Sequence, residues 1–290
     1  MPRKLYLGPL TDNRRWDKFS ARADDIYVVT PPKCGTTWMQ TIVALLLSGD
    51  PEVEPELSIK MPWIDIRIRE MEDVVGRLEA MTHRRAVKSH TPLDGLPYRK
   101  DGQFICVFRH PLDAHFSFRK HVRNVPVGGF ELFYPEDDTT GIAFRRFLDG
   151  GAEGFDMDAM PLAHILRHYE AALALKDQPN VSLFHYADMS ADLAGTMARV
   201  ADLLGISHSA DLMARLVKAA TFDNMKAHAD RFAPSGGKGF FKSDSAFFES
   251  GASGKWEGVL SQAEIAAYDA AMDSALKKDT RRWLEFGQGA

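Results

Sequence analysis

Residues that could bind an anion lie together in the segment YVVTPPKCGTTWMQ, residues 27–40. Lys33 supplies a positive charge, Gly35 lets another molecule approach the backbone closely, and Thr36 and Thr37 supply hydroxyl groups. The segment joins an apolar run that predicts a strand to an apolar run that predicts a helix. Such a turn presents backbone N–H groups at the positive end of a helix, which favours phosphate binding. The segment therefore predicts a cradle for a phosphate-like anion.

The order of these residues differs from that of a Walker A loop. In a Walker A loop the lysine follows the last glycine and directly precedes the hydroxyl residue that binds magnesium. Here Lys33 precedes Gly35, and no second glycine lies just upstream. A polar turn with a purely structural role stays open as an alternative from these residues alone.

Two further candidates follow a strand-like run at residues 86–89. His90 ends this run, and a histidine at a strand end can act as a general base. Lys88 lies two residues earlier and therefore points to the same face of the strand. A histidine with a structural role and a solvated lysine are the alternatives for the two positions.

A second pair of candidates surrounds the start of a helical pattern. Arg109 follows the apolar run 104–108, and Ser117 lies eight residues later. A guanidinium can pair with phosphate through two parallel hydrogen bonds, and serine can add another donor. A structural salt bridge explains Arg109 equally well when this residue is considered alone.

Alternating strands and helices are expected to position these side chains. Strand-like runs occupy residues 26–30, 86–89, 104–108 and 181–186. Helical patterns occupy residues 37–47, 111–123, 162–175 and 193–204. The alternation predicts one α/β domain over residues 1–290, with a central parallel sheet flanked by helices. Ligands of such sheets bind at the carboxyl edge. Two long segments, 124–159 and 233–258, look like loops, and loops of this length are usually functional lids or disordered segments.

Composition excludes several classes of protein. The chain of 290 residues has a net charge of −4 with acids and bases mixed, so it lacks the basic stripe of a nucleic-acid binder. Its two cysteines, Cys34 and Cys106, have no metal-ligand partners nearby and suit a reducing cytoplasm. The longest apolar run, 42–47, is far shorter than the roughly 20 residues that span a bilayer. We expect a cytoplasmic protein with no metal and no membrane insertion.

Six segments together resemble the cytosolic sulfotransferases, and the chain looks like a bacterial member of that family. They occur in the family's order and at similar spacings: FSARADDIYVVTPPKCGTTWMQ, VKSHTPL, CVFRHPLDAHFSF, LFHYADM, TFDNMK and GASGKW. The resemblance spans almost the whole chain. It implies 3′-phosphoadenosine 5′-phosphosulfate (PAPS) as co-substrate and 3′-phosphoadenosine 5′-phosphate (PAP) as product, with no metal.

The resemblance also implies a role for each candidate residue. The P-loop-like strand–loop–helix would hold the 5′-phosphosulfate through Lys33, Cys34, Gly35, Thr36 and Thr37. Further nucleotide contacts would come from residues at the 3′-phosphate and around the adenine: Arg109, Ser117, Ser250, Gly251, Trp38, Phe222, Tyr186 and Thr221. His90 would deprotonate the acceptor hydroxyl, with Lys88 beside the acceptor. Lys33 would stabilise the bridging oxygen as the sulfuryl group leaves.

The sequence departs from the family pattern at two places. Cys34 replaces the usual serine, which removes one hydroxyl donor but keeps the backbone N–H. Glu249 and Ser250 replace an Arg-Lys pair beside the 3′-phosphate, so we expect a lysine of the loop to substitute. Among the loop lysines we favour the first two over the third: Lys238, Lys242 and Lys255. The usual dimerisation signature is not recognisable at 256–264, which leaves a homodimer open.

The sequence therefore predicts transfer of a sulfuryl group from PAPS to a hydroxyl of a small, apolar acceptor. Phenols, steroids and glycolipids all stay open. Aromatic residues of the two long segments suit an apolar pocket: Phe130, Phe133, Tyr134, Phe144, Phe147, Phe240, Phe241, Phe247 and Phe248. One alternative is a non-catalytic nucleotide-binding module. Another is an ATP-dependent kinase, which the missing Walker A lysine disfavours.

Overall fold

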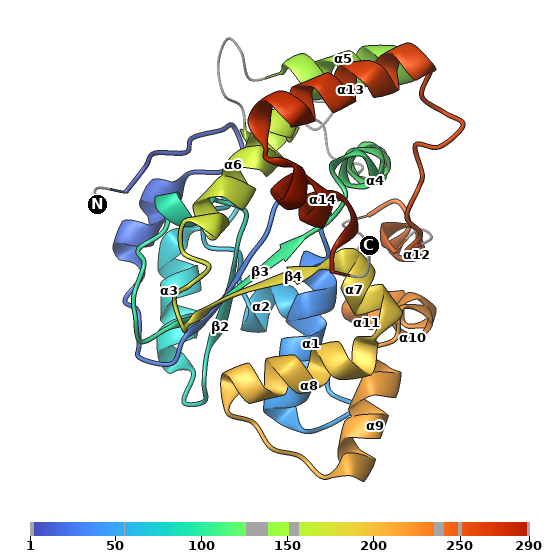
Figure 1. Ribbon diagram of the computed structural model, residues 1–290. Coiled ribbons are helices and arrows are strands. Elements are labelled where there is room, and N and C mark those ends of the chain that lie inside the picture. Colours follow the sequence, from blue (N-terminus) through green and yellow to red (C-terminus); the bar gives the residue numbers. More distant parts are fainter. Residues whose placement is uncertain are drawn as a thin grey trace.

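A sheet of four parallel strands forms the centre of the protein (Figure 1). The computed structural model describes residues 3–54, 56–125, 139–150, 157–234, 241–248 and 251–288. The strand order is β2-β1-β3-β4. The strands are β1 (Ile26–Val29), β2 (Ala86–Ser89), β3 (Gln103–Phe108) and β4 (Val181–His185). Register is set by Tyr27 opposite Val87 and Phe104, and by Phe104 opposite Val181. The predicted parallel α/β architecture is confirmed.

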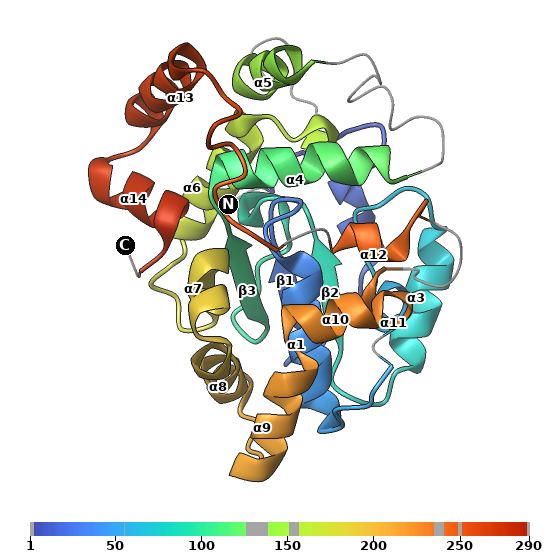
Figure 2. The same ribbon diagram turned by 90° about the vertical axis from the view of Figure 1, so that its right-hand side faces the viewer.

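Helices cover both faces of this sheet (Figures 1 and 2). Side chains alternate along β1, so Ile26 and Val28 enter one core and Tyr27 and Val29 enter the other. The first core contains residues of α1 (Thr36–Ser48), α2 (Leu57–Lys60), α7 (Tyr186–Ala191), α8 (Leu193–Leu204), α9 (Ala210–Ala219), α10 (Phe222–Ala227) and α11 (Ala229–Phe232). The second contains residues of α3 (Met71–Ala80), α4 (Pro111–Arg123), α5 (Thr140–Asp149), α6 (Leu162–Leu173), α13 (Gln262–Ala275) and α14 (Lys278–Phe286). Burial on both faces explains why the strands read as apolar runs.

Short elements complete the described chain. They are the 3-10 helices η1 (Asn13–Lys18), η2 (Leu93–Gly95) and η4 (Met157–Ala159), and the four-residue helix α12 (Asp244–Phe247). Among the described residues, no helix combines the length and the hydropathy needed to cross a membrane.

The prediction of a loop over 124–159 is wrong in part. This segment contains α5, and the face of α5 that carries Ala143, Phe144 and Phe147 is buried in the core. The two phenylalanines therefore stabilise the fold and do not line an acceptor pocket. The segment 233–258 likewise contains α12. The other aromatic candidates Phe130, Phe133, Tyr134 and Phe240 lie outside the described residues.

The chain places a candidate residue after each strand of the sheet. Thr30 follows β1, His90 follows β2, Arg109 follows β3 and Tyr186 follows β4. All four strands are parallel, so these residues meet at the carboxyl edge. In the sheet, β2 lies on one side of β1 and β3 lies on the other, so the connections from β1 and from β2 run in opposite directions. Ligands of open α/β sheets bind in the crevice at such a switch point.

Candidate active site

A cavity of about 390 Å³ opens at this carboxyl edge. It is lined by most of the predicted site residues: Lys33, Gly35, Thr36, Thr37, Trp38, Lys88, His90, Arg109, Ser117, Tyr186, Phe222 and Gly251. These residues come from all four strand ends, from α1 and α4, and from the C-terminal loop. In the described ranges, no group of three or more His, Cys, Asp or Glu side chains could hold a metal ion.

The turn after β1 has the backbone conformation of an anion cradle. Lys33 and Gly35 both have positive φ angles, 64° and 103°. A β-carbon at Gly35 would lie 3.1 Å from Cδ2 of Tyr186, so glycine is required by space as well as by conformation. The hydroxyls of Thr30 and Thr36 share a hydrogen bond that ties the strand end to the first turn of α1. The cradle is thus built before any ligand arrives.

His90 is held in the tautomer that a general base requires. Its Nδ1 lies 2.7 Å from the carbonyl oxygen of Thr30. A carbonyl oxygen only accepts hydrogen bonds, so Nδ1 carries the proton and Nε2 has a free lone pair. Burial and the nearby Lys88 ammonium keep the pKa of His90 well below 6.5. The imidazole is therefore neutral at pH 7 and can take a proton.

Lys88 and Trp63 form the neighbouring wall of the cavity. The Lys88 Nζ lies 4.5 Å from the centroid of the Trp63 ring, a cation–π contact. The Trp63 and His90 rings meet edge to face, with centroids 4.7 Å apart. Burial lowers the pKa of Lys88 to about 8, so the amine is still mainly protonated at pH 7.

Arg109 fastens the C-terminal loop to the sheet edge. Its guanidinium carbon lies 4.2 Å from the centroid of the Tyr186 ring, and Nη2 donates to the Ala252 carbonyl at 2.7 Å. The Tyr186 hydroxyl donates to the Gly251 carbonyl at 3.1 Å. Arg109 Nε has no hydrogen-bond partner among the described residues, although it is buried. A buried donor of this kind suits an anionic ligand.

Aromatic side chains border the same part of the cavity. Trp38 is fixed by its Nε1, which donates to the Ala220 carbonyl at 2.8 Å, and its ring meets Tyr186 edge to face at 5.3 Å. The Phe222 ring lies 3.0 Å from where a β-carbon of Gly251 would stand. Trp38 and Phe222 therefore offer two rigid rings to a planar ligand.

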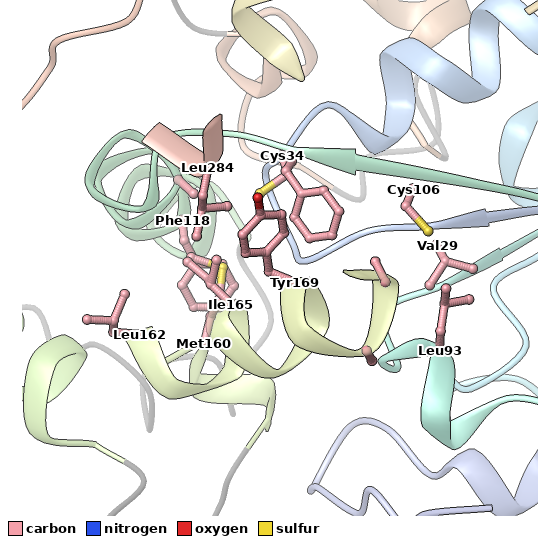
Figure 3. Close-up of a cluster of buried hydrophobic side chains, with 14 of the residues drawn as sticks. Val29, Cys34, Leu93, Cys106, Phe118, Met160, Leu162, Ile165, Tyr169 and Leu284 are labelled. Atoms are coloured by element: carbon pink, nitrogen blue, oxygen red, sulfur yellow. The ribbon is translucent and has the colours of Figure 1, made fainter. Parts of the chain in front are cut away.

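Three residues that were expected to contact the nucleotide are not seen to line the cavity. The Cys34 side chain is fully buried in the core below the cradle (Figure 3), so only its backbone could reach a ligand. Thr221 caps α10, where its hydroxyl accepts from the Asn224 N–H, and it does not line the cavity. Ser250 lies outside the described residues, as do Glu249 and Lys238.

The expected order of the loop lysines Lys238, Lys242 and Lys255 stays a prediction, because Lys238 lies outside the described residues. Lys255 lines the cavity, whereas Lys242 does not. The reason is the turn before Lys255, whose backbone N–H groups at Gly254 and Lys255 donate to the two Asp113 oxygens at 3.1 and 2.9 Å. These bonds hold the turn against α4.

Burial predicts that both thiols are inert. Cys34 and Cys106 are buried, and burial raises the pKa of each thiol to about 12. Only a thiolate reacts quickly with alkylating reagents. We therefore expect no labelling of the native protein by iodoacetamide at pH 8 within an hour, and two labels per chain in denaturant. Mass spectrometry of the intact protein measures both numbers. Rapid labelling of the native chain would mean that the core around one of the two cysteines opens.

Sequence reasoning missed Asp65, Trp63 and His121. Trp63 and His121 line the cavity, and Asp65 is buried behind it. Asp65 and Trp63 lie in a stretch that has no strand or helix pattern, so nothing marked them. His121 lies four residues after Ser117 on α4, which is one helical turn, and this spacing could have marked it.

Comparison with known proteins agrees with this geometry. The sulfotransferase domain family matches residues 23–280. A glycolipid sulfotransferase of Mycobacterium tuberculosis is 36% identical over 99% of this chain and 95% of its own length. The crystal structures of a mouse sulfotransferase complexed with PAP and of retinol dehydratase complexed with retinol and PAP share the fold. Each has a TM-score of 0.72 at 20% identity. The match to the mouse sulfotransferase covers 93% of this chain and 90% of that one. The match to retinol dehydratase covers 96% of this chain and 91% of that one. The chain therefore belongs to the sulfotransferase family.

Proposed function

We propose that the protein transfers the sulfuryl group of PAPS to a hydroxyl group of a lipid-like acceptor, with His90 as the base. The observation that carries the proposal is the fixed tautomer of His90, whose free Nε2 shares one cavity with Lys33 and Arg109. The PAP complexes of the structural relatives support the choice of nucleotide. Lys33, Gly35, Thr36 and the N-terminus of α1 would hold the phosphosulfate.

The reaction follows from these roles. His90 Nε2 takes the proton of the acceptor hydroxyl, and the acceptor oxygen forms a bond to sulfur. The bond between sulfur and the bridging oxygen breaks, and that oxygen leaves as part of the 5′-phosphate of PAP. Lys33 stabilises the negative charge on this leaving oxygen. Positioning and electrostatic stabilisation supply most of the rate in transfers with such a loose transition state.

Binding of the 3′-phosphate should depend on Arg109 and Lys255. We expect Arg109→Ala and Lys255→Ala each to weaken PAP binding by about 10-fold or more, because a charge-assisted hydrogen bond is lost. Binding of adenosine 5′-phosphate, which lacks the 3′-phosphate, should change by less than about 3-fold. Isothermal titration of both nucleotides measures the difference. Lys242→Ala is the matched control, since Lys242 lies in the same segment but not at the cavity.

Equal weakening of both nucleotides would contradict this assignment. Loss of affinity in Lys242→Ala but not in Lys255→Ala would assign the 3′-phosphate to Lys242, as the sequence analysis favours.

The acceptor side of the cavity is apolar and suits a lipid. Its lining includes Leu10, Ile66, Phe241, Phe247 and the 57% exposed Ile68. The mycobacterial relatives are named glycolipid sulfotransferases, which supports a sugar hydroxyl carried on an apolar chain. The proposed acceptor class is therefore a glycolipid.

A panel of acceptors tests both parts of the proposal. The protein is incubated with ³⁵S-labelled PAPS and with octyl glucoside, 4-nitrophenol or androsterone, and labelled products are separated by chromatography. We expect octyl glucoside to be sulfated fastest. Faster sulfation of 4-nitrophenol or androsterone would overturn the acceptor class and leave sulfuryl transfer intact. Binding of PAP without turnover on any acceptor would favour the non-catalytic module. A requirement for Mg²⁺ and ATP would favour a kinase.

The two buried thiols also support a cytoplasmic location, where cysteines stay reduced. A homodimer stays a prediction, which sedimentation analysis of the purified protein tests.

A further inference from the structure

Asp65 is a fully buried carboxylate behind the acceptor side of the cavity. Its Oδ1 accepts hydrogen bonds from Trp16 Nε1 at 2.7 Å and from Ser89 Oγ at 2.9 Å. Its Oδ2 accepts from Trp63 Nε1 at 2.9 Å, from the His90 N–H at 2.9 Å and from Ser89 Oγ at 3.0 Å. Each oxygen therefore has at least two donors within hydrogen-bond distance, and the two oxygens share the single Ser89 proton.

The hydrogen-bond donors around Asp65 are of the kind that a buried carboxylate needs to stay charged. An ionised carboxyl group only accepts hydrogen bonds, whereas a protonated one must also donate. Three of the four partners of Asp65, two indole N–H groups and a backbone N–H, can only donate, so they favour its ionised form. Burial raises the pKa of Asp65, and the hydrogen bonds from Trp63, His90, Ser89 and Trp16 offset only part of that rise. A charge buried without such partners would cost several kcal/mol.

The partners of Asp65 are the groups that shape the acceptor site. The His90 N–H fixes the residue whose side chain is the proposed base. The Trp63 indole contacts the His90 ring at its edge and the Lys88 ammonium at its face. Ser89 holds the next turn in place, because its Oγ accepts from the Thr91 N–H at 3.0 Å. One carboxylate thus connects β2, the Trp63 wall and the loop that follows His90.

We propose that Asp65 is a positioning residue for sulfuryl transfer, which aligns His90 and the Trp63–Lys88 pair toward the acceptor and stabilises the Lys88 ammonium. The proposal rests on the role of His90 as base proposed above. Asp65 acts through these neighbours and does not line the cavity itself.

The charge of Asp65 gives a readout that a structural role would not change. The groups that interact electrostatically with Lys88 are Asp65, Arg69, His90 and His121. Asp65 raises the pKa of Lys88, while Arg69 and burial lower it to about 8. Loss of the Asp65 charge must therefore shift the Lys88 titration to lower pH. A general loosening of the site would let water reach Lys88 and shift the titration to higher pH.

The first test is Asp65→Asn, which keeps the size of the side chain and removes the charge. With PAP bound, the titration of Lys88 is followed by NMR of ¹³C-labelled lysine, with Lys88→Met to assign the signal. We expect the midpoint to fall by at least about 0.5 pH unit. Turnover of octyl glucoside should fall by about 10- to 100-fold, as for a misplaced reacting group. The KM for PAPS should stay nearly unchanged.

A matched pair of tryptophan variants keeps the proposal falsifiable if Asp65→Asn does not fold. Trp16→Phe and Trp63→Phe each remove one hydrogen bond to Asp65, but only Trp63 contacts His90 and Lys88. We expect Trp63→Phe to lower turnover by about 10-fold or more, and Trp16→Phe to stay within about 3-fold of the native rate. NMR of ¹⁵N-labelled histidine should show the Nδ1–H tautomer of His90 weakened in Trp63→Phe alone.

Two results would overturn the proposal. One is an unchanged or raised midpoint of Lys88 in Asp65→Asn. The other is an equal effect of the two tryptophan variants on turnover and on the His90 tautomer. A native protein that sulfates no acceptor would instead refute the proposed function, and the two NMR readouts would still decide the role of Asp65.

Discussion

Replacing His90 by alanine is expected to lower turnover by about 10²–10⁴-fold, the usual effect of losing a positioned general base. The structure gives the physical reason, since His90 Nδ1 donates to the Thr30 carbonyl and leaves Nε2 as the proton acceptor. PAP affinity should change by less than about 3-fold, because the role proposed for His90 is toward the acceptor and not the nucleotide. Single-turnover transfer from ³⁵S-labelled PAPS and titration of PAP measure the two quantities.

The exposed His83 offers a control for this prediction. His83 lies in the loop before β2, away from the cavity lining, so His83→Ala should leave turnover unchanged. Near-normal turnover in His90→Ala would remove His90 from the mechanism.

The pH dependence of turnover should also identify His90 as the base. The pKa of His90 is lowered well below 6.5, so the imidazole is neutral above that pKa and is lost as a base only below it. Turnover should therefore stay flat from pH 7 down to pH 6.5 and fall only at lower pH. A decline already complete at pH 6.5 would show that another group acts as base.

The strand ends were predictable from the apolar runs of the sequence and from the parallel arrangement that alternating strands and helices imply. Apolar runs gave the positions of all four strands to within one residue, since strands buried on both faces need continuous apolar side chains. A parallel sheet then brings the residues after those strands to one edge. The pattern therefore predicts that His90 and Arg109, which end two of these runs, lie near the turn after the first strand.

The helical layers were harder to predict. The helix α5 lies in a segment whose Gly, Pro and Asp residues looked like a loop, and its apolar side has only three buried residues. The helix α13 buries only Tyr268 and Met272 along 14 residues. The helix α13 leaves little periodic signal because most of its sequence faces solvent, whereas α5 is amphipathic and was hidden by the loop-like residues around it.

The parts of the site that the sequence does not mark depend on tertiary contacts. Lys255 reaches the cavity because Asp113, far away in the sequence, accepts hydrogen bonds from its turn. Asp65 has donors from η1, from β2 and from its own loop. No local pattern marks such a residue, since the groups that make it useful meet only in the folded chain.

Replacing Lys33 by methionine should lower the rate of sulfuryl transfer by about 10²–10³-fold, the loss expected when a donor to the developing charge is removed. Lys33 belongs to the cradle at the N-terminus of α1 and has a left-handed backbone with φ of 64°. Its Nζ lies 4.3 Å from the centroid of the Phe247 ring, at the same cavity that His90 lines. The ammonium therefore lies beside the cradle and the Phe247 ring, where the proposed reaction places negative charge on the bridging oxygen.

The decisive comparison is between the chemical step and nucleotide affinity. A charge needed only when the bridging oxygen leaves affects the transition state more than the bound substrate. Lys33→Met should therefore lower the single-turnover rate far more than it weakens PAPS binding, whereas Arg109→Ala should do the reverse. Lys33→Arg is the matched control, because it keeps the positive charge in the same left-handed backbone position, and it should retain more of the rate than Lys33→Met. If Lys33→Met instead weakens PAPS binding as much as it slows transfer, Lys33 holds the nucleotide equally in both states, and the leaving oxygen is stabilised by the backbone N–H groups of the cradle.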